Sequence, residues 1–214
     1  MRTNPEPASA VPSDTWSWNE AGWLLGARQC PSPNFGPRPT GTAVDLLIVH
    51  SISLPPGQYG GNEVCQLFTN QLDWSAHPYF ESIRGIEVSA HFLIRRTGEV
   101  VQFVSVHDRA WHAGASTWGG RSNCNDFSIG VELEGLEGET FESAQYTSLA
   151  RLGEALKAIC PISAIAGHEH VAPGRKQDPG PGFEWPRLQQ MLGWANQCFP
   201  DTTLTAGSKS DDLA

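Results

Sequence analysis

The 214-residue sequence has no long hydrophobic run, and this lack argues against a membrane protein. No stretch approaches the roughly 18 consecutive apolar residues of a membrane-spanning helix. The first residues, Met1 to Pro7, also lack the apolar core of a secretory signal. The sequence therefore predicts a protein that stays in the cytoplasm and has no membrane partner.

Cysteine and positive charge are also scarce. The five Cys residues are widely spaced and form no CxxC pair, which favours reduced thiols over a disulfide framework or a cysteine zinc site. The 14 Lys and Arg residues face 23 Asp and Glu residues, a formal net charge of -9. A chain with this negative charge binds phosphate groups poorly, so we expect no nucleic-acid partner.

The length and a hydrophobic content of 39% suit one core. The sequence shows neither a repeat nor an internal linker. Residues 1–16 and 201–214 mix Pro, Ser, Thr and Asp without periodicity, so they are predicted as flexible tails. Residues 17–200 then form a single domain, which we expect to be a monomer.

Four segments have the patterns of strands. The aliphatic run Val44–His50 is typical of a strand buried on both faces. The segment 90–104, with Thr97 and Gly98 at its turn, predicts a hairpin. Residues 128–135 alternate, which places Glu132 and Glu134 together on the face opposite the apolar side chains. A shorter strand is predicted at 162–165.

Helices are predicted between and after these strands. Apolar residues at three- and four-residue steps from Leu149 to Ile159 indicate one helix. Pro186 suits the first turn of a last helix, and its predicted buried stripe is Leu188, Met191, Leu192 and Ala195. Residues 62–72 form a weaker candidate. We therefore expect an α/β fold, a mixed central sheet flanked by helices on both faces, with a cleft at one end of the sheet.

The segment 167–181 is the richest in chemical groups. It is too rich in Pro and Gly to predict a helix, and it carries His168, Lys176 and Asp178. A rigid loop can bring an imidazole nitrogen and a carboxylate oxygen to one cation, with Lys176 beside it. One further ligand is then missing.

A zinc hydrolase needs three protein ligands and an open position for water, whose pKa the metal lowers to roughly 7. His50, at the end of a buried strand, can join His168 and Asp178 as the third ligand. Amide cleavage also needs a base and a group that stabilises the oxyanion. Lys176 is a candidate for the second role, and Glu132 for the first, but spacing alone does not separate Glu132 from Glu134.

Five ordered blocks carry a family resemblance: LLIVHSISLPPG, VSAHFLIRRTGEVVQFV, RAWHAGAS, CNDFSIGVELEG and GHEHVAPGRKQDPGP. Together they resemble the N-acetylmuramoyl-L-alanine amidases, and most closely the AmpD type, which acts on anhydro-muropeptides recycled from the cell wall. The resemblance implies the fold shared with peptidoglycan recognition proteins and one Zn²⁺ ion. It also implies hydrolysis of the amide between the muramoyl lactyl group and L-alanine.

The resemblance assigns roles to individual residues. It makes His50, His168 and Asp178 the zinc ligands and selects Glu132 as the catalytic carboxylate. It makes Lys176 the residue that stabilises the oxyanion. It implies that Trp111, His112 and Ala172 contact the substrate. The sequence departs from the nearest relatives at Ser51, where Asn is usual, and at Glu87, where Arg is frequent, and both changes concern substrate binding.

Two other functions compete with this one. Some proteins of this fold bind peptidoglycan fragments without cutting them, but such binders commonly lack the full ligand set that this sequence has. A metallopeptidase that cuts within the stem peptide is disfavoured, since the sequence has no HExxH motif. For His91 and His170 we favour structural roles, with His91 bonded to a buried polar partner.

Overall fold

The computed structural model describes residues 16–200, so nearly all of the predicted N-terminal tail and the whole of the C-terminal tail lie outside the described residues. The strands of this part are β1 Ser17–Trp18, β2 Leu24–Leu25, β3 Arg28–Gln29, β4 Phe35–Gly36, β5 Leu46–Ile52, β6 Phe92–Ile94, β7 Val100–Gln102, β8 Arg109–Ala110, β9 Thr117–Trp118, β10 Arg121–Ser122, β11 Ser128–Glu134 and β12 Ala164–Gly167. The helices are α1 Glu63–Phe68, α2 Pro78–Ser82, α3 Ser143–Lys157, α4 His168–Val171 and α5 Trp185–Leu192, with 3₁₀ turns η1 Trp74–Ala76, η2 Cys124–Asp126 and η3 Asn196–Cys198.

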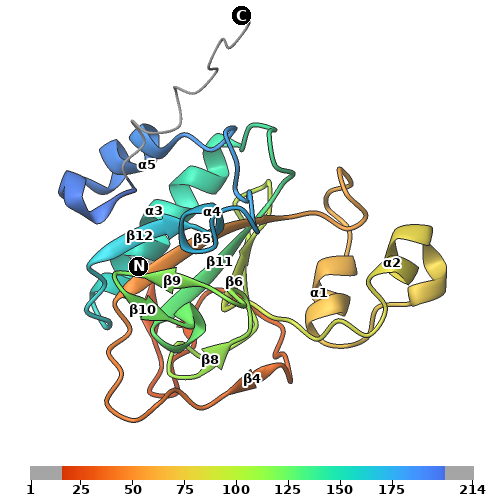
Figure 1. Ribbon diagram of the computed structural model, residues 1–214, viewed down its shortest axis with the longest axis horizontal. Helices are drawn as coiled ribbons and strands as arrows, with labels where there is room; N and C mark the ends of the chain where they lie inside the picture. The colour runs from red at the N-terminus through yellow and green to blue at the C-terminus, as the bar shows by residue number, and fades with distance from the viewer. Residues whose placement is uncertain (1–15, 201–214) are drawn as a thin grey trace, which may run out of the picture.

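Six strands form the central sheet in the order β12-β5-β11-β6-β7-β3 (Figure 1). The pairs β12/β5, β5/β11 and β11/β6 are parallel, β6/β7 is the predicted antiparallel hairpin, and β7/β3 is again parallel. The prediction of a mixed sheet is therefore confirmed. Parallel strands need crossovers, and α3 supplies the one between β11 and β12.

The two central strands are buried on both faces. The five residues from Leu46 to His50 are buried, and so is every residue of β11, including its two glutamates. Such strands need apolar runs, which explains the aliphatic pattern of β5. Their parallel register places Glu132 beside His50.

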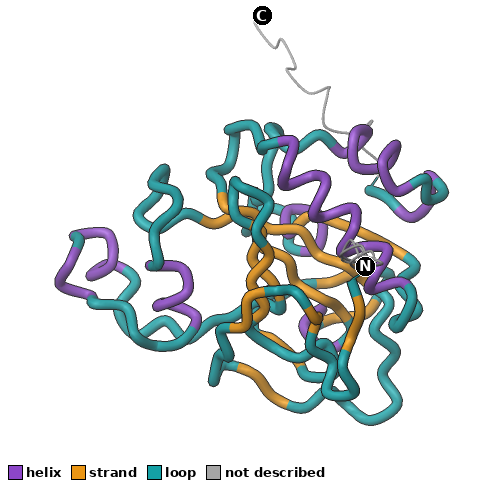
Figure 2. The backbone as a smooth tube through the Cα atoms, turned by 180° about the vertical axis from the view of Figure 1, so that it is seen from behind, coloured by secondary structure: helices purple, strands orange, loops and turns teal. Residues whose placement is uncertain are grey.

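Helix α3 packs across one face of the sheet together with α5, as the view from behind shows (Figure 2). Gln145 anchors its first turn: Gln145 Oε1 accepts from the Glu142 backbone N–H at 2.9 Å, and Gln145 Nε2 donates to the carbonyls of Ile94 and Glu134 at 3.2 and 3.1 Å. The same side chain thus caps the helix and ties it to two strands.

Shorter elements cover the opposite face. The apolar side chains of α1 and α2 pack with those of β6 and β7, while α4 and η2 pack against β5 and β12. In Figure 1, α1 and α2 extend to one side of the sheet. Helices on both faces were predicted, and this prediction is confirmed. None of the helices in residues 16–200 has the length and apolar character that a membrane crossing requires.

Some sequence-based boundaries were wrong. Ile159 follows the end of α3 and is exposed, and Met191 and Ala195 are also exposed rather than part of the buried stripe of α5. Gly193, with φ of 64°, ends α5 before Ala195. The strand expected at 162–165 is β12, two residues later, and α1 is shorter than 62–72. The segment 167–181 was predicted to contain no helix, yet its residues 168–171 form the single turn α4.

Candidate active site

The two histidines of the predicted ligand set lie at one edge of the sheet because their strands are parallel neighbours. His50 is in the last part of β5, and His168 follows directly after β12. The register pairs Gly167 with Val49, so the next residue of each strand is a histidine. Asp178 reaches the same point from the loop after α4, and its backbone carbonyl accepts from the Glu169 N–H at 2.9 Å.

Three side-chain atoms form a nearly equilateral triangle. His50 Nδ1 and His168 Nδ1 are 3.0 Å apart, and Asp178 Oδ2 is 3.1 Å from the first and 3.0 Å from the second. Zn–N and Zn–O distances of about 2.0–2.1 Å in a tetrahedral site require ligand atoms roughly 3.3 Å apart. The triangle is close to this spacing, and all three residues are buried. These residues can hold a metal ion.

The hydrogen bonds of His168 leave the right nitrogen for a metal. His168 Nε2 lies 3.1 Å from the Ala113 carbonyl oxygen, which can only accept, so Nε2 carries the proton. Nδ1 of the neutral ring is then unprotonated and faces the triangle. Arg175 also donates to the Ala113 carbonyl at 2.7 Å and holds this loop in place.

Burial and the contacts within the triangle determine the protonation states of His50 and Asp178. Burial lowers the pKa of His50 to about 4, against the opposing attraction of the nearby Asp178 carboxylate, so the ring is neutral near pH 7 as ligation requires. Burial alone would raise the pKa of Asp178, but the close contact with the two imidazoles of His168 and His50 outweighs it and leaves this pKa lowered. The site thus combines two neutral imidazoles with one carboxylate.

The triangle lies in a cleft of about 560 Å³. Such a volume suits a small molecule or a short peptide. The lining combines apolar residues from the segment before β6 with Glu132 of β11 and residues that follow this strand. The lining includes His50, Ser51, Ile52, Leu54, Pro56, Leu67, Phe68, Tyr79, Ile83, Ile86, Val88, Trp111, His112, Glu132, Leu136, Glu137, His168, Lys176 and Asp178.

The structure separates the two glutamates that spacing left equivalent. Glu134 is held by three donors: the backbone N–H of Gly60 at 2.8 Å and of Arg96 at 3.1 Å, and Arg95 Nη1 at 3.3 Å. Glu132 lines the cleft, and no group within residues 16–200 hydrogen-bonds its buried Oε2. Burial and the nearby Asp178 raise the pKa of Glu132 well above its usual value, while Lys176 acts in the opposite direction.

The remaining predicted residues differ in position. Lys176 is exposed at the cleft, where its charge acts on both Glu132 and His50. Trp111 also lines the cleft, and its backbone N–H donates to Ser89 Oγ at 3.0 Å. Ala172 is buried and is not among the described residues that line this cleft. Its carbonyl accepts from the backbone N–H groups of Arg175 and Lys176 at 3.1 and 3.0 Å.

His112 lines the cleft but also contacts His50, a residue of the predicted ligand set, directly. Its Nδ1 lies 2.9 Å from His50 Nε2, and burial lowers the pKa of His112 well below its usual value. Sequence reasoning assigned His112 to the substrate and missed this contact. The sequence shows only that residue 112 is a histidine. Its distance along the chain from residue 50 does not indicate that the two rings are in contact.

The cleft also has an apolar wall. The apolar wall formed by Tyr79, Ile83 and Ile86 was not predicted, because α2 has no strong helical pattern.

The structural role expected for His91 is confirmed: its Nδ1 accepts from the Gly130 N–H at 3.0 Å, and its Nε2 lies 3.1 Å from the Asp108 carbonyl. His170 Nδ1 accepts from the Gly167 N–H at 2.9 Å and so caps α4.

Comparisons with known proteins agree with this geometry. A sequence profile of the family described as N-acetylmuramoyl-L-alanine amidase matches residues 40–181. The 1,6-anhydro-N-acetylmuramyl-L-alanine amidase AmpD of Escherichia coli strain K12 is 50% identical over 175 residues, which cover 81% of this chain and 96% of that protein.

Solved structures give the same result. A crystal structure of a selenomethionine derivative of AmpD superposes with a TM-score of 0.79 at 50% identity, covering 81% of this chain and 98% of that one. The amidase AmiD from E. coli, solved with the substrate anhydro-N-acetylmuramic acid-L-Ala-D-γ-Glu-L-Lys, matches with a TM-score of 0.51 at 25% identity. That match covers 81% of this chain and 65% of AmiD.

Proposed function

The chain belongs to the N-acetylmuramoyl-L-alanine amidase family, and from this premise we propose that it hydrolyses the amide between the lactyl group of 1,6-anhydro-N-acetylmuramic acid and L-alanine of the stem peptide. The observation that carries the proposal is the buried triangle of His50, His168 and Asp178 beside Glu132 in one cleft. A binder of fragments would have no need of this combination.

The metal of this proposal is a single Zn²⁺ ion. Two imidazole nitrogens and one carboxylate oxygen are a ligand set that zinc hydrolases use. His50, His168 and Asp178 would hold the ion. When bound, it would supply Lewis acidity at the cleft floor and lower the pKa of water there.

Glu132 is proposed to carry the protons of the reaction. It accepts the proton that the attacking water loses and returns it to the departing alanine nitrogen. Its environment supports both roles, because burial raises the pKa of the Glu132 carboxyl and so makes it a stronger base than an exposed glutamate. Its free Oε2 leaves the carboxyl available to a substrate, whereas Glu134 is already committed to its three donors.

Lys176 is proposed to stabilise the negative charge that develops on the amide oxygen. An ammonium group at the cleft acts on this charge more strongly in the transition state than in the ground state, which lowers the barrier. Trp111 and His112 line the cleft and are proposed to contact the substrate, with the Trp111 ring packing on its apolar parts. Contact between Ala172 and the substrate stays a prediction, as do the monomeric state and the location in the cytoplasm.

The test is to incubate the purified protein with anhydro-muropeptide and, separately, with intact sacculi, each with and without a chelator. We expect mass analysis to find free stem peptide and anhydro-muramic acid, and the chelator to abolish both. Zinc content is measured on the same sample. Binding of the fragment without cleavage, at full zinc occupancy, would instead identify a recognition module. Cuts within the peptide would identify a metallopeptidase.

A further inference from the structure

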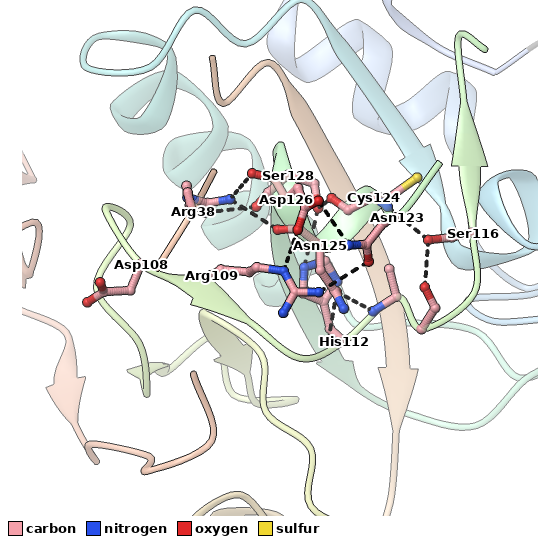
Figure 3. A network of polar contacts seen from close by, with 12 residues as sticks. Arg38, Asp108, Arg109, His112, Ser116, Asn123, Cys124, Asn125, Asp126 and Ser128 are labelled. Carbon is pink, nitrogen blue, oxygen red and sulfur yellow. Dashed lines mark hydrogen bonds and ion pairs between the residues drawn. The ribbon is translucent and has the colours of Figure 1, made fainter. Parts of the chain in front are cut away.

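A chain of hydrogen bonds runs from His50 through His112 and Ser128 to a backbone carbonyl of η2. His50 Nε2 lies 2.9 Å from His112 Nδ1, His112 Nε2 lies 3.3 Å from Ser128 Oγ, and Ser128 Oγ lies 2.6 Å from the Cys124 carbonyl oxygen. Figure 3 shows His112, Ser128 and Cys124 within the polar network that surrounds η2. The chain ends on a backbone group that cannot change its role.

The last link determines the direction of every other link. A carbonyl oxygen only accepts, so the Ser128 hydroxyl donates its single proton to Cys124. The hydroxyl oxygen must then accept from His112 Nε2, which carries a proton. His112 Nδ1 is therefore unprotonated in the neutral ring, and it accepts from His50 Nε2. The proton of His50 is held on Nε2, away from the triangle.

The surrounding structure holds the His112 ring in place. A Cβ atom at Gly130 would lie 2.4 Å from His112 Cγ, so the ring packs directly on the backbone of β11. Asn125 Oδ1 accepts from the backbone N–H groups of His112 and Ala113 at 3.1 and 2.7 Å. The His112 ring also meets those of His50 and His91 edge to face, at centroid distances of 5.0 and 5.7 Å. An ordinary surface histidine has no such confinement.

We propose that His112 is a positioning residue: by accepting the Nε2 proton of His50 it keeps His50 Nδ1 free for the metal, and Ser128 and the Cys124 carbonyl set its orientation. This inference rests on the proposed metal site. His168 is oriented separately, by the Ala113 carbonyl. His112 therefore orients His50, and the Ala113 carbonyl orients His168. These two partners are consecutive residues of the segment that follows β8.

Three substitutions test the roles of the two side chains. His112→Phe keeps a ring but removes the acceptor, which leaves the buried Nε2–H of His50 unpaired. His112→Asn restores an acceptor oxygen near the position of Nδ1. Ser128→Ala removes the group that orients His112. The matched control is Ser116→Ala, because Ser116 Oγ accepts from the Cys124 backbone N–H at 3.0 Å in the same network but lies outside the chain that reaches His50.

The primary measurement is zinc affinity by competition with a chromogenic chelator, with the visible spectrum of the Co²⁺-substituted protein as a report on ligand geometry. We expect His112→Phe to weaken zinc binding about 10- to 100-fold and to alter the spectrum. His112→Asn should recover most of this loss, Ser128→Ala should give a smaller one, and Ser116→Ala should bind like the wild type. If His112 only contacts the substrate, KM rises in His112→Phe and zinc affinity stays within twofold of the wild type.

A second measurement needs no variant. Nitrogen-15 NMR of the histidine rings in the zinc-loaded wild-type protein should assign the proton of His50 to Nε2 and that of His112 to Nε2. A proton on His112 Nδ1 would overturn the inference even if every variant failed to fold. A wild-type protein that binds no zinc would refute the proposed function itself, so the two failures are distinguishable.

Discussion

The two glutamates of β11 should respond differently to replacement by glutamine. Glu132→Gln should lower activity without lowering stability, whereas Glu134→Gln should lower stability. Glu132→Gln removes a carboxylate whose Oε2 has no hydrogen-bond partner within residues 16–200. Glu134→Gln removes the charge from a buried carboxylate that faces Arg95 and two backbone N–H groups. The two positions are matched controls for each other, since they share a strand, a face and a side-chain shape.

The magnitudes follow from these contacts. Glu134→Gln keeps one side-chain oxygen but turns the other acceptor into an NH₂ group that faces a buried donor, which costs about 1–3 kcal/mol, while Arg95 keeps its ion pair to Glu99 Oε2 at 3.2 Å. For a domain of this size, that cost lowers Tm by about 2–12 °C. Glu132→Gln takes no partner away from a neighbouring donor and removes a charge that burial disfavours, so we expect the variant to be no less stable than the wild type near pH 7. Its kcat should fall about 10²- to 10⁴-fold, because the proton carrier is lost.

The pH dependence has a defined sign. A carboxyl whose pKa is raised in the folded state contributes stability that is present below its unfolded pKa, about 4.3, and lost as pH rises through the folded pKa. In metal-free protein, Glu132→Gln should therefore gain stability relative to the wild type as pH rises above about 4.3. Scanning calorimetry between pH 4 and pH 8 measures this difference, and cleavage of anhydro-muropeptide measures kcat. A large loss of Tm in Glu132→Gln, or near-wild-type Tm in Glu134→Gln, would refute the reasoning.

Further outcomes test other parts of the site. Lys176→Met should lower kcat about 10²- to 10³-fold with zinc content unchanged, and equal kcat in the variant would remove Lys176 from the mechanism. Chelation should lower Tm, and added zinc should restore it in proportion to the logarithm of its concentration; a Tm insensitive to zinc would argue against the metal site. Gly130→Ala places a methyl group against the His112 ring and should cost about 1–3 kcal/mol by denaturant unfolding. Glu87→Arg adds a cation at an exposed position between the cleft residues Ile86 and Val88, and should lower KM for substrates with a free stem-peptide carboxylate. Unchanged KM would separate residue 87 from substrate binding.

Local patterns were sufficient for much of the fold. The aliphatic run of β5, the hairpin of β6 and β7, and the alternation of β11 identify the central strands because each pattern is set by the faces that one strand buries. Element ends were predicted less well. Gly193 ends α5 before Ala195, and α4 begins inside a segment whose Pro and Gly content argued against a helix.

The sequence by itself determined the chemical inventory: two histidines and an aspartate of suitable types, a lysine beside them, and two equivalent glutamates on one strand. Tertiary structure decided how these groups are used. The parallel register brings His50 beside Glu132, and the surroundings leave Glu132 free while binding Glu134. Only the folded chain places His112 against His50, because that contact joins two segments whose spacing in the sequence carries no information about their distance in space.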